Sequence, residues 1–87
     1  MHTKLHTAAL DGHETPISNS AAAIVRMGFN PSTLPQVDAL KGLHAAAISE
    51  CEAIRDAGGK GAREAAIAIT KLQEASMFAV AAATADL

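Results

Sequence analysis

The amino-acid sequence predicts an all-α fold, in which two long helices form an antiparallel hairpin behind a short N-terminal helix. Three observations carry this prediction. Apolar residues recur at alternating three- and four-residue steps through two long segments, as on one face of a helix. Only a few residues around Gly59 separate those segments, so the helices must fold back on each other. Alanine supplies 21 of the 87 residues, which gives slender helices that can approach closely.

Length, charge and cysteine content narrow the class of protein. A chain of 87 residues forms a small core and commonly gains stability from oligomerisation. Its single cysteine, Cys51, excludes an internal disulfide and is interpreted as a small buried hydrophobe in a reducing compartment. A net charge of −2 argues against DNA binding but leaves room for a small anionic ligand.

Neither a secretory leader nor a membrane span is predicted. Residues 1–12 contain no continuous apolar run, and the most apolar stretch, 77–85, is about half the length that a bilayer requires. We therefore expect a soluble protein without a membrane partner, which stays in the compartment where it is made.

Residues 1–31 are predicted to form an N-terminal region distinct from the hairpin domain, residues 32–87. Residues 1–17 lack a sustained period and indicate a flexible or loosely docked arm. A short helix is expected to run from Asn19 or Ser20 to Met27, with Ser18 as its N-cap and Gly28 ending it. Residues 28–32 then form an extended turn, because a residue before proline avoids the α region.

The first long helix is predicted to begin near Thr33. Thr33 and Gln36 have the spacing of a capping box, and Pro35 lies in the first turn, where proline is tolerated. Polar residues, Lys41 and Glu52 among them, lie mainly off the apolar stripe, and Gly58 ends the helix. The stripe consists of Val37, Leu40, His44, Ala47, Cys51 and Ile54.

The second long helix is predicted from Gly61 or Ala62 to about Ala83. It is apolar around most of its circumference, and a lone hairpin would expose this surface to water. We therefore predict a homo-oligomer, because the N-terminal helix is too short to cover that surface. The stripe that faces the first helix consists of Ala65, Ile69, Leu72, Ser76, Ala79 and Ala83, and the remaining apolar set consists of Ala66, Ile67, Met77, Val80 and Ala81.

Motifs for catalysis or metal binding are weak, and we predict neither an enzyme nor a bound metal or cofactor. His2 and His6 have helical ligand spacing, with Asp11 and His13 downstream, but their segment has no helical period. Solvated side chains are the favoured interpretation there. Residues 58–61 look like a phosphate loop but follow a helix rather than a strand.

Arg63 and Thr70 form a candidate anion site. Arg63 lies at a helix start, where free N–H groups favour anions, and Thr70 lies two turns further on the same face. Such pairs from symmetry mates could converge on one small anion. From spacing alone, an ordinary surface arginine and a threonine bonded to its own backbone remain the better interpretation.

Residues 63–82 read Arg-Glu-x-x-x-Ala-Ile-Thr-Lys-Leu-x-Glu-Ala-x-Met-Phe-Ala-x-Ala-Ala. This pattern resembles the second helix of the phage anti-CBASS sponges, which bind cyclic oligonucleotides, and of related anti-Thoeris proteins. In that family an aromatic-x-Pro turn precedes a first helix with a basic residue, and Phe29-Asn30-Pro31 followed by the helix to Ala57 fits this order. The resemblance covers residues 27–85 and is most specific in the second helix.

The resemblance implies a hexamer that sequesters cyclic nucleotide messengers of CBASS-type or Thoeris immunity without cleaving them, in the cytoplasm of an infected bacterium. Cyclic ADP-ribose isomers are further candidate ligands. For cyclic dinucleotides, which the family holds in pockets between paired protomers, the implied contacts are Phe29 as the stacking aromatic, the turn residues Asn30 and Pro31, and Lys41 or His44 as the basic group. For cyclic trinucleotides, held where three subunits meet, the implied contacts are Arg63 and Thr70.

This sequence departs from the family pattern at several positions. Asn30 and Ser32 replace residues that are commonly histidine and proline, and Phe78 stands where tryptophan is frequent. If His44 is the basic group, binding should weaken as pH rises, because histidine loses its charge near neutral pH. The alternative hypothesis is a structural helical-hairpin oligomerisation module with no small ligand, and a metal- or DNA-binding regulator is disfavoured.

Overall fold

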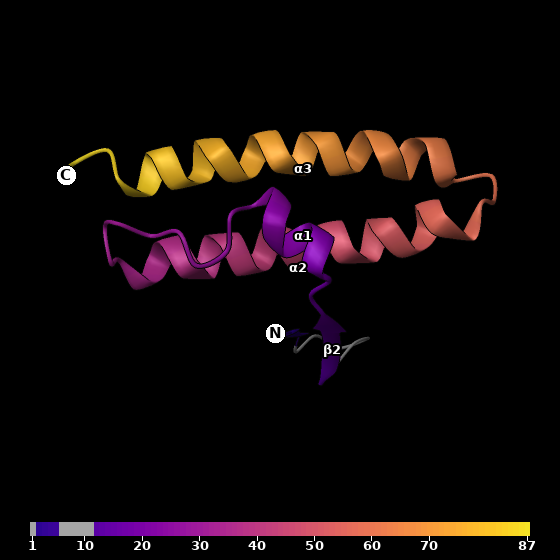
Figure 1. The fold of residues 1–87 in the computed structure, drawn as a ribbon, viewed down its shortest axis with the longest axis horizontal. Helices are drawn as coiled ribbons and strands as arrows, with labels where there is room; N and C mark the ends of the chain where they lie inside the picture. The colour runs from indigo at the N-terminus through magenta and orange to yellow at the C-terminus, as the bar shows by residue number, and fades with distance from the viewer. Residues whose placement is uncertain (1, 6–11) are drawn as a thin grey trace.

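The computed structural model describes residues 2–5 and 12–87 (Figure 1). Two strands, β1 (His2–Leu5) and β2 (His13–Pro16), precede a short helix, α1 (Asn19–Ile24), and two long helices, α2 (Pro35–Ala57) and α3 (Ala62–Ala83). The long helices lie side by side and antiparallel, and both strands and α1 contact α2 (Figure 1). The predicted helical hairpin is confirmed.

The two strands correct the all-α prediction and the prediction of an arm without regular structure. They pair antiparallel, with Thr3 opposite Thr15. Four-residue strands are too short to give a clear alternating pattern, and contacts with α2 hold them in place. Thr15 is buried and its hydroxyl donates to Glu50 Oε2 at 2.6 Å, while the Thr3 hydroxyl donates to the Gly42 carbonyl at 3.4 Å.

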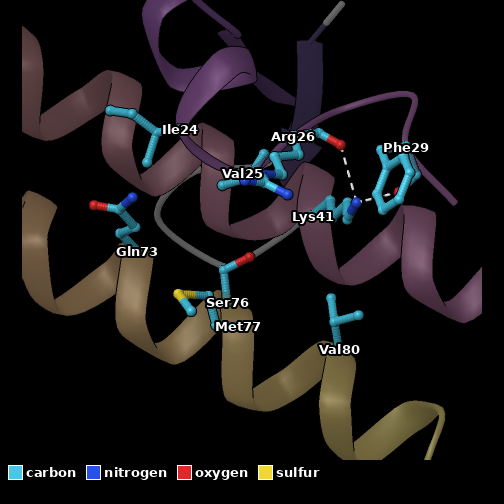
Figure 2. Close-up of a pocket in the computed structure, with 9 residues that line it drawn as sticks. All are labelled: Ile24, Val25, Arg26, Phe29, Lys41, Gln73, Ser76, Met77 and Val80. Carbon is cyan, nitrogen blue, oxygen red and sulfur yellow. Dashed lines mark hydrogen bonds between the residues drawn. The ribbon is translucent and has the colours of Figure 1, made fainter.

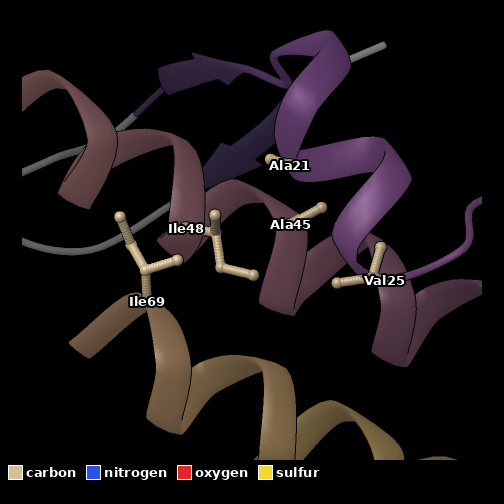
Figure 3. Close-up of a cluster of buried hydrophobic side chains, with 5 residues drawn as sticks. All are labelled: Ala21, Val25, Ala45, Ile48 and Ile69. Atoms are coloured by element: carbon tan, nitrogen blue, oxygen red, sulfur yellow. The ribbon is translucent and has the colours of Figure 1, made fainter. Parts of the chain in front are cut away.

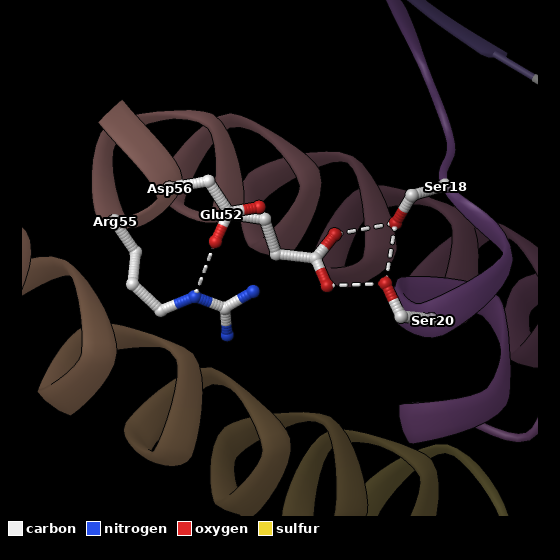
Figure 4. A network of polar contacts seen from close by, with 5 residues as sticks. All are labelled: Ser18, Ser20, Glu52, Arg55 and Asp56. Atoms are coloured by element: carbon white, nitrogen blue, oxygen red, sulfur yellow. Dashed lines mark hydrogen bonds and ion pairs between the residues drawn. The ribbon is translucent and has the colours of Figure 1, made fainter. Parts of the chain in front are cut away.

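Helix α1 is attached to α2 through a buried carboxylate. Ser18 is the N-cap, as predicted, and its hydroxyl accepts from the Ala21 N–H at 3.0 Å. The buried Glu52 carboxylate accepts hydrogen bonds from the hydroxyls of Ser18 and Ser20 (Figure 4). The helix ends at Ile24, before the predicted Met27, because Arg26 takes a left-handed backbone conformation with φ of 57°.

The predicted capping box of α2 is wrong. Thr33 has φ of 58°, and the N-cap is Leu34, which makes no side-chain cap. Side chains of the preceding loop instead form hydrogen bonds with the backbone of the N-cap residue. The Ser32 hydroxyl accepts from the Leu34 N–H, and Asn30 Nδ2 donates to the Leu34 carbonyl at 2.9 Å. Proline in the first turn and the left-handed Gly58 at the end of α2 are as predicted.

The buried face of α2 differs from the predicted stripe. Ile54 is 52% exposed, whereas Lys41 and Glu52 are buried. Helix α2 lies between α3 and the N-terminal segment, so its buried face is wider than one stripe and includes the polar groups that hold that segment. The core joins three helices (Figure 3) and consists of Ala21, Val25, Ala45, Ile48 and Ile69.

Helix α3 buries the predicted stripe, with Ala65, Ile69 and Ser76 at its centre. Its opposite face exposes large apolar side chains, and Phe78 is 78% accessible. The predicted uncovered apolar surface is therefore confirmed within the described chain. By length and composition alone α3 is also long and apolar enough to cross a bilayer.

Candidate functional site

Two cavities adjoin the turn around Phe29. The first, about 450 Å³, lies between the turn, α2 and α3 (Figure 2). The second, about 430 Å³, is lined by the turn residues Asn30, Pro31 and Ser32 and by the C-terminal Thr84 and Leu87. Phe29 and Lys41 line both cavities. The polar or turn-derived lining of the first consists of Arg26, Phe29, Lys41, Gln73 and Ser76.

Lys41, on α2, is hydrogen-bonded to the backbone of the turn that contains Phe29. Its Nζ donates to the carbonyl oxygens of Arg26, at 2.9 Å, and of Phe29 (Figure 2). The same atom lies 5.5 Å from the centre of the Phe29 ring, within the range of a cation–π contact. The side chain is only 5% exposed, and no carboxylate of the described residues pairs with it. Its positive charge therefore makes the electrostatic potential in the adjoining cavity more positive.

Phe29 presents an aromatic surface at the cavity mouth. The residue is 60% exposed, and Lys41 lies over one face of its ring. Aromatic rings exposed in this way can stack on nucleobases, and each such contact contributes about 1–3 kcal/mol. The structure thus brings together four residues of the predicted dinucleotide site around adjoining cavities: Phe29, Asn30, Pro31 and Lys41.

Asn30 is engaged mainly in shaping the turn. Its Nδ2 donates to the Leu34 carbonyl and, at 3.2 Å, to Asp38 Oδ1. Its Oδ1 accepts from the Ser32 hydroxyl. These bonds fix the loop that leads into α2 and leave Asn30 as part of the wall of the second cavity.

His44 lines neither cavity. The ring is half-buried, and Nδ1 lies 2.8 Å from the Leu40 carbonyl, which leaves Nε2 for other contacts. Within one subunit, the structure therefore does not bring His44 together with the other predicted dinucleotide residues.

Arg63 and Thr70 lie on the exposed side of α3. The Arg63 side chain is 80% accessible, and its Nη1 lies 3.6 Å from Glu64 Oε1. Thr70 is exposed, and neither residue lines either of the two cavities beside Phe29. A pair this open can enclose a ligand only where another molecule closes over it.

Sequence reasoning missed Arg26, Gln73 and Ser76 as cavity residues. Ser76 is 3% exposed and interrupts an otherwise apolar stripe, which is the signal that could have singled it out. Arg26 comes three residues before Phe29, and it was predicted to lie inside the short helix that ends at Met27. Gln73 carried no such signal.

A second polar cluster joins β2 to α2. His13 Nε2 lies 3.3 Å from Glu50 Oε2, beside the Thr15 hydroxyl. The hydrogen bond from Thr15, then that from His13, lowers the pKa of the Glu50 carboxyl below its ordinary value of 4.5. His6 and Asp11, two of the residues considered as metal ligands, lie outside the described residues.

Comparison with known proteins finds a family match for the helical region of the chain. The family model for the Acb2/Tad1 hairpin domain matches residues 21–84, whereas no curated protein and no solved structure matches the chain. The matched region includes the Phe29 turn, α2 and α3, and it excludes both strands. The family consists of sponge-type binding domains rather than known enzymes. Since the match spans most of the sequence, the chain belongs to the Acb2/Tad1 hairpin family.

Proposed function

We propose that this chain is a sponge for cyclic di- and trinucleotide messengers, which it sequesters without cleaving them. By withholding the messenger it would block CBASS-type or Thoeris antiviral signalling in the cytoplasm of an infected bacterium. The observation that carries the proposal is the exposed Phe29 ring beside a cavity with a buried, carboxylate-free Lys41 ammonium. Both lie inside the family-matched region.

The chemistry of a cyclic dinucleotide fits this arrangement. A base stacks on the exposed face of Phe29, and the anionic phosphodiester lies in the positive potential of the first cavity. A cavity of about 450 Å³ is in the size range of small-molecule sites. Sequestration requires affinity and abundance, and the side chains of the cavity supply a ring, cations and hydrogen-bond donors for that purpose.

The proposed protein acts as a homo-oligomer, with a hexamer as the expected size. Phe78 and Met77 are 78% and 67% exposed, far more than large apolar side chains prefer in a free monomer. Helix α3 also carries Arg63, Glu64 and Lys71 along its length, which favours a protein-facing over a lipid-facing helix.

Cyclic trinucleotides are proposed to bind where copies of Arg63 and Thr70 meet. Arginine can donate two parallel hydrogen bonds to a phosphodiester, and threonine adds a hydroxyl. Because both side chains are exposed in one subunit, this site depends on assembly.

Calorimetry against a panel of 3′,3′- and 2′,3′-linked cyclic dinucleotides, cyclic trinucleotides and a cyclic ADP-ribose isomer tests the proposal. We expect binding of at least one messenger, which is then released unchanged on heat denaturation, as mass spectrometry can determine. No heat across the panel would contradict the sponge function and favour a structural oligomerisation module. Light scattering tests the assembly separately, and a monodisperse monomer would contradict it.

Arg63→Ala tests the separation of the two sites. We expect this variant to lose cyclic trinucleotide binding and to keep dinucleotide binding, because Arg63 lies away from both cavities. Loss of both ligands together, with the assembly intact, would contradict the assignment of separate sites.

A further inference from the structure

Lys41 has little capacity left for a ligand. An ammonium group has three hydrogen-bond donors, and two of them are engaged by the carbonyls of Arg26 and Phe29. The side chain is buried against the Phe29 ring, so a phosphate could reach at most one remaining donor. The main contribution of Lys41 is therefore to hold the turn in place.

The turn that Lys41 holds places Arg26 at the cavity. Arg26 has φ of 57°, a conformation that costs a non-glycine residue about 1–2 kcal/mol. Two hydrogen bonds to its carbonyl maintain it, from Lys41 Nζ and from the Phe29 N–H at 3.1 Å. Strained backbone persists where surrounding contacts over-determine it, as they do here.

The Arg26 guanidinium is free to bind an anion. It lines the first cavity and makes no ion pair or hydrogen bond with any residue that the structure describes. The other arginines differ, since Arg55 Nε lies 2.9 Å from Asp56 Oδ1 and Arg63 lies near Glu64. Guanidinium groups match the two free oxygens of a phosphodiester, which they bind in a bidentate manner.

Ser76 provides an independent observation on the opposite wall. The residue is 97% buried, given its 3% exposure, and lines the same cavity from α3. Its hydroxyl has no hydrogen-bond partner among the described residues, and Figure 2 shows its oxygen directed away from α3 into the cavity. No buried side-chain oxygen or nitrogen of the described residues lacks a partner, so the Ser76 oxygen is itself open to the cavity, where a ligand can reach it.

We propose that Arg26 and Ser76 form the phosphodiester-binding subsite of the Phe29 cavity, with Lys41 as the residue that positions Arg26. This inference rests on the proposed function and deepens it. The Arg26 guanidinium binds the phosphodiester, the Ser76 hydroxyl donates to it from the facing helix, and a base of the same ligand stacks on Phe29. Arg26, Ser76 and Phe29 line this cavity from the same subunit.

Calorimetry of Arg26→Ala and Ser76→Ala with 3′,3′-cyclic di-AMP, cyclic di-GMP and cyclic GMP-AMP tests the subsite. We expect Arg26→Ala to weaken the dinucleotides that the native chain binds by roughly 10- to 100-fold, as for the loss of a hydrogen-bonded charge. Ser76→Ala should weaken them by about fivefold. Lys60→Ala is the matched control, since Lys60 is exposed in the α2–α3 loop, lines neither cavity and should bind as the native chain does.

Cyclic triadenylate is the control ligand in the same experiment. Arg26→Ala should bind it with the same affinity as the native chain. Native affinity of Arg26→Ala for dinucleotides would overturn the subsite while leaving the sponge function in place. Equal loss of di- and trinucleotides would also overturn it, because the effect would not be local. If the native chain binds no messenger, the proposed function itself fails and the subsite with it.

If Arg26→Ala does not fold, Arg26→Lys decides the question. Lysine keeps the charge but lacks the bidentate geometry. Weaker dinucleotide binding with a native melting temperature would support the subsite, and unchanged binding would overturn it.

Discussion

The ammonium of Lys41 binds the backbone carbonyl of Phe29 and also lies 5.5 Å from the centre of the ring of the same residue. One buried charge therefore fixes both the backbone and the ring of the exposed aromatic. Ordering a side chain on binding costs about 0.5–1.5 kcal/mol, and a ring held in place beforehand avoids much of that cost. The stacking surface is thus prepared before a ligand arrives.

Lys41→Met should loosen this turn. The variant keeps the apolar stem but removes both carbonyl contacts, so the free energy of unfolding should fall by about 1–3 kcal/mol. Urea denaturation measures this change, and amide hydrogen exchange should accelerate over residues 26–31. The exposed Lys60→Met serves as control, and equal stability of the two variants would contradict a structural role for Lys41.

The contact between Glu52 and the two serines should stabilise the attachment of α1. Ser18→Ala removes the N-cap together with one hydrogen bond to Glu52, and should lower the free energy of unfolding by about 1–2 kcal/mol. Ser20→Ala removes a bond to Glu52 and the contact with the Ser18 hydroxyl but leaves the N-cap in place, and should cost less. A thermal-denaturation series compares them, with Thr33→Ala, outside this contact, as control; the reverse order would contradict the cap.

Acid should weaken the contact between β2 and α2. Hydrogen bonds from Thr15 and His13 lower the pKa of Glu50, so the charged carboxylate contributes stability above its ordinary pKa of 4.5. That contribution is lost as pH falls below 4.5 and through the folded-state pKa. Amide exchange in β2, corrected for intrinsic rates, should show this loss, and Glu50→Gln should remove its pH dependence. A pH-independent native protein would exclude the mechanism.

Phe78→Glu should dissociate the proposed assembly. A carboxylate placed among exposed apolar side chains would be desolvated in an interface, which costs several kcal/mol per subunit contact. Light scattering should report a smaller species with native helical content by circular dichroism. Lys60→Glu makes a charge change in the loop and should leave the mass unchanged. An unchanged mass for Phe78→Glu would place the interface elsewhere.

His44→Gln should leave dinucleotide affinity within about twofold of the native value, because His44 lines neither cavity and its Nδ1 is engaged by Leu40. Affinity should likewise show no histidine-like transition between about pH 6 and 8. Calorimetry at several pH values measures both. A large loss would mean that a second subunit brings its own His44 to the cavity.

Periodicity was sufficient to predict the helical hairpin, because its determinants are local. Alternating apolar spacing and the glycines at 58 and 59 define two helices that end within a residue or two of the predicted bounds. The strands and the burial of Lys41 and Glu52 could not be predicted in this way. They depend on contacts such as Ser20 with Glu52, between residues 32 positions apart in the chain.

In the candidate site, too, residues that are neighbours in the sequence could be predicted, whereas residues brought together by tertiary packing could not. Phe29, Asn30 and Pro31 form a contiguous motif, and the family resemblance singles them out. Arg26 and Ser76 come from a turn and a helix 50 positions further along, and only the packing of α3 against α2 brings them to one cavity. A sequence does not specify which serine of a helix faces a distant turn.

The second cavity has a practical consequence, since Thr84 and Leu87 form part of its wall. Any polypeptide joined after Leu87 starts at the edge of that cavity. A fused reporter or affinity tag at this end would therefore compete with small molecules for the space beside Phe29. Dinucleotide affinities measured with and without such an extension should therefore differ.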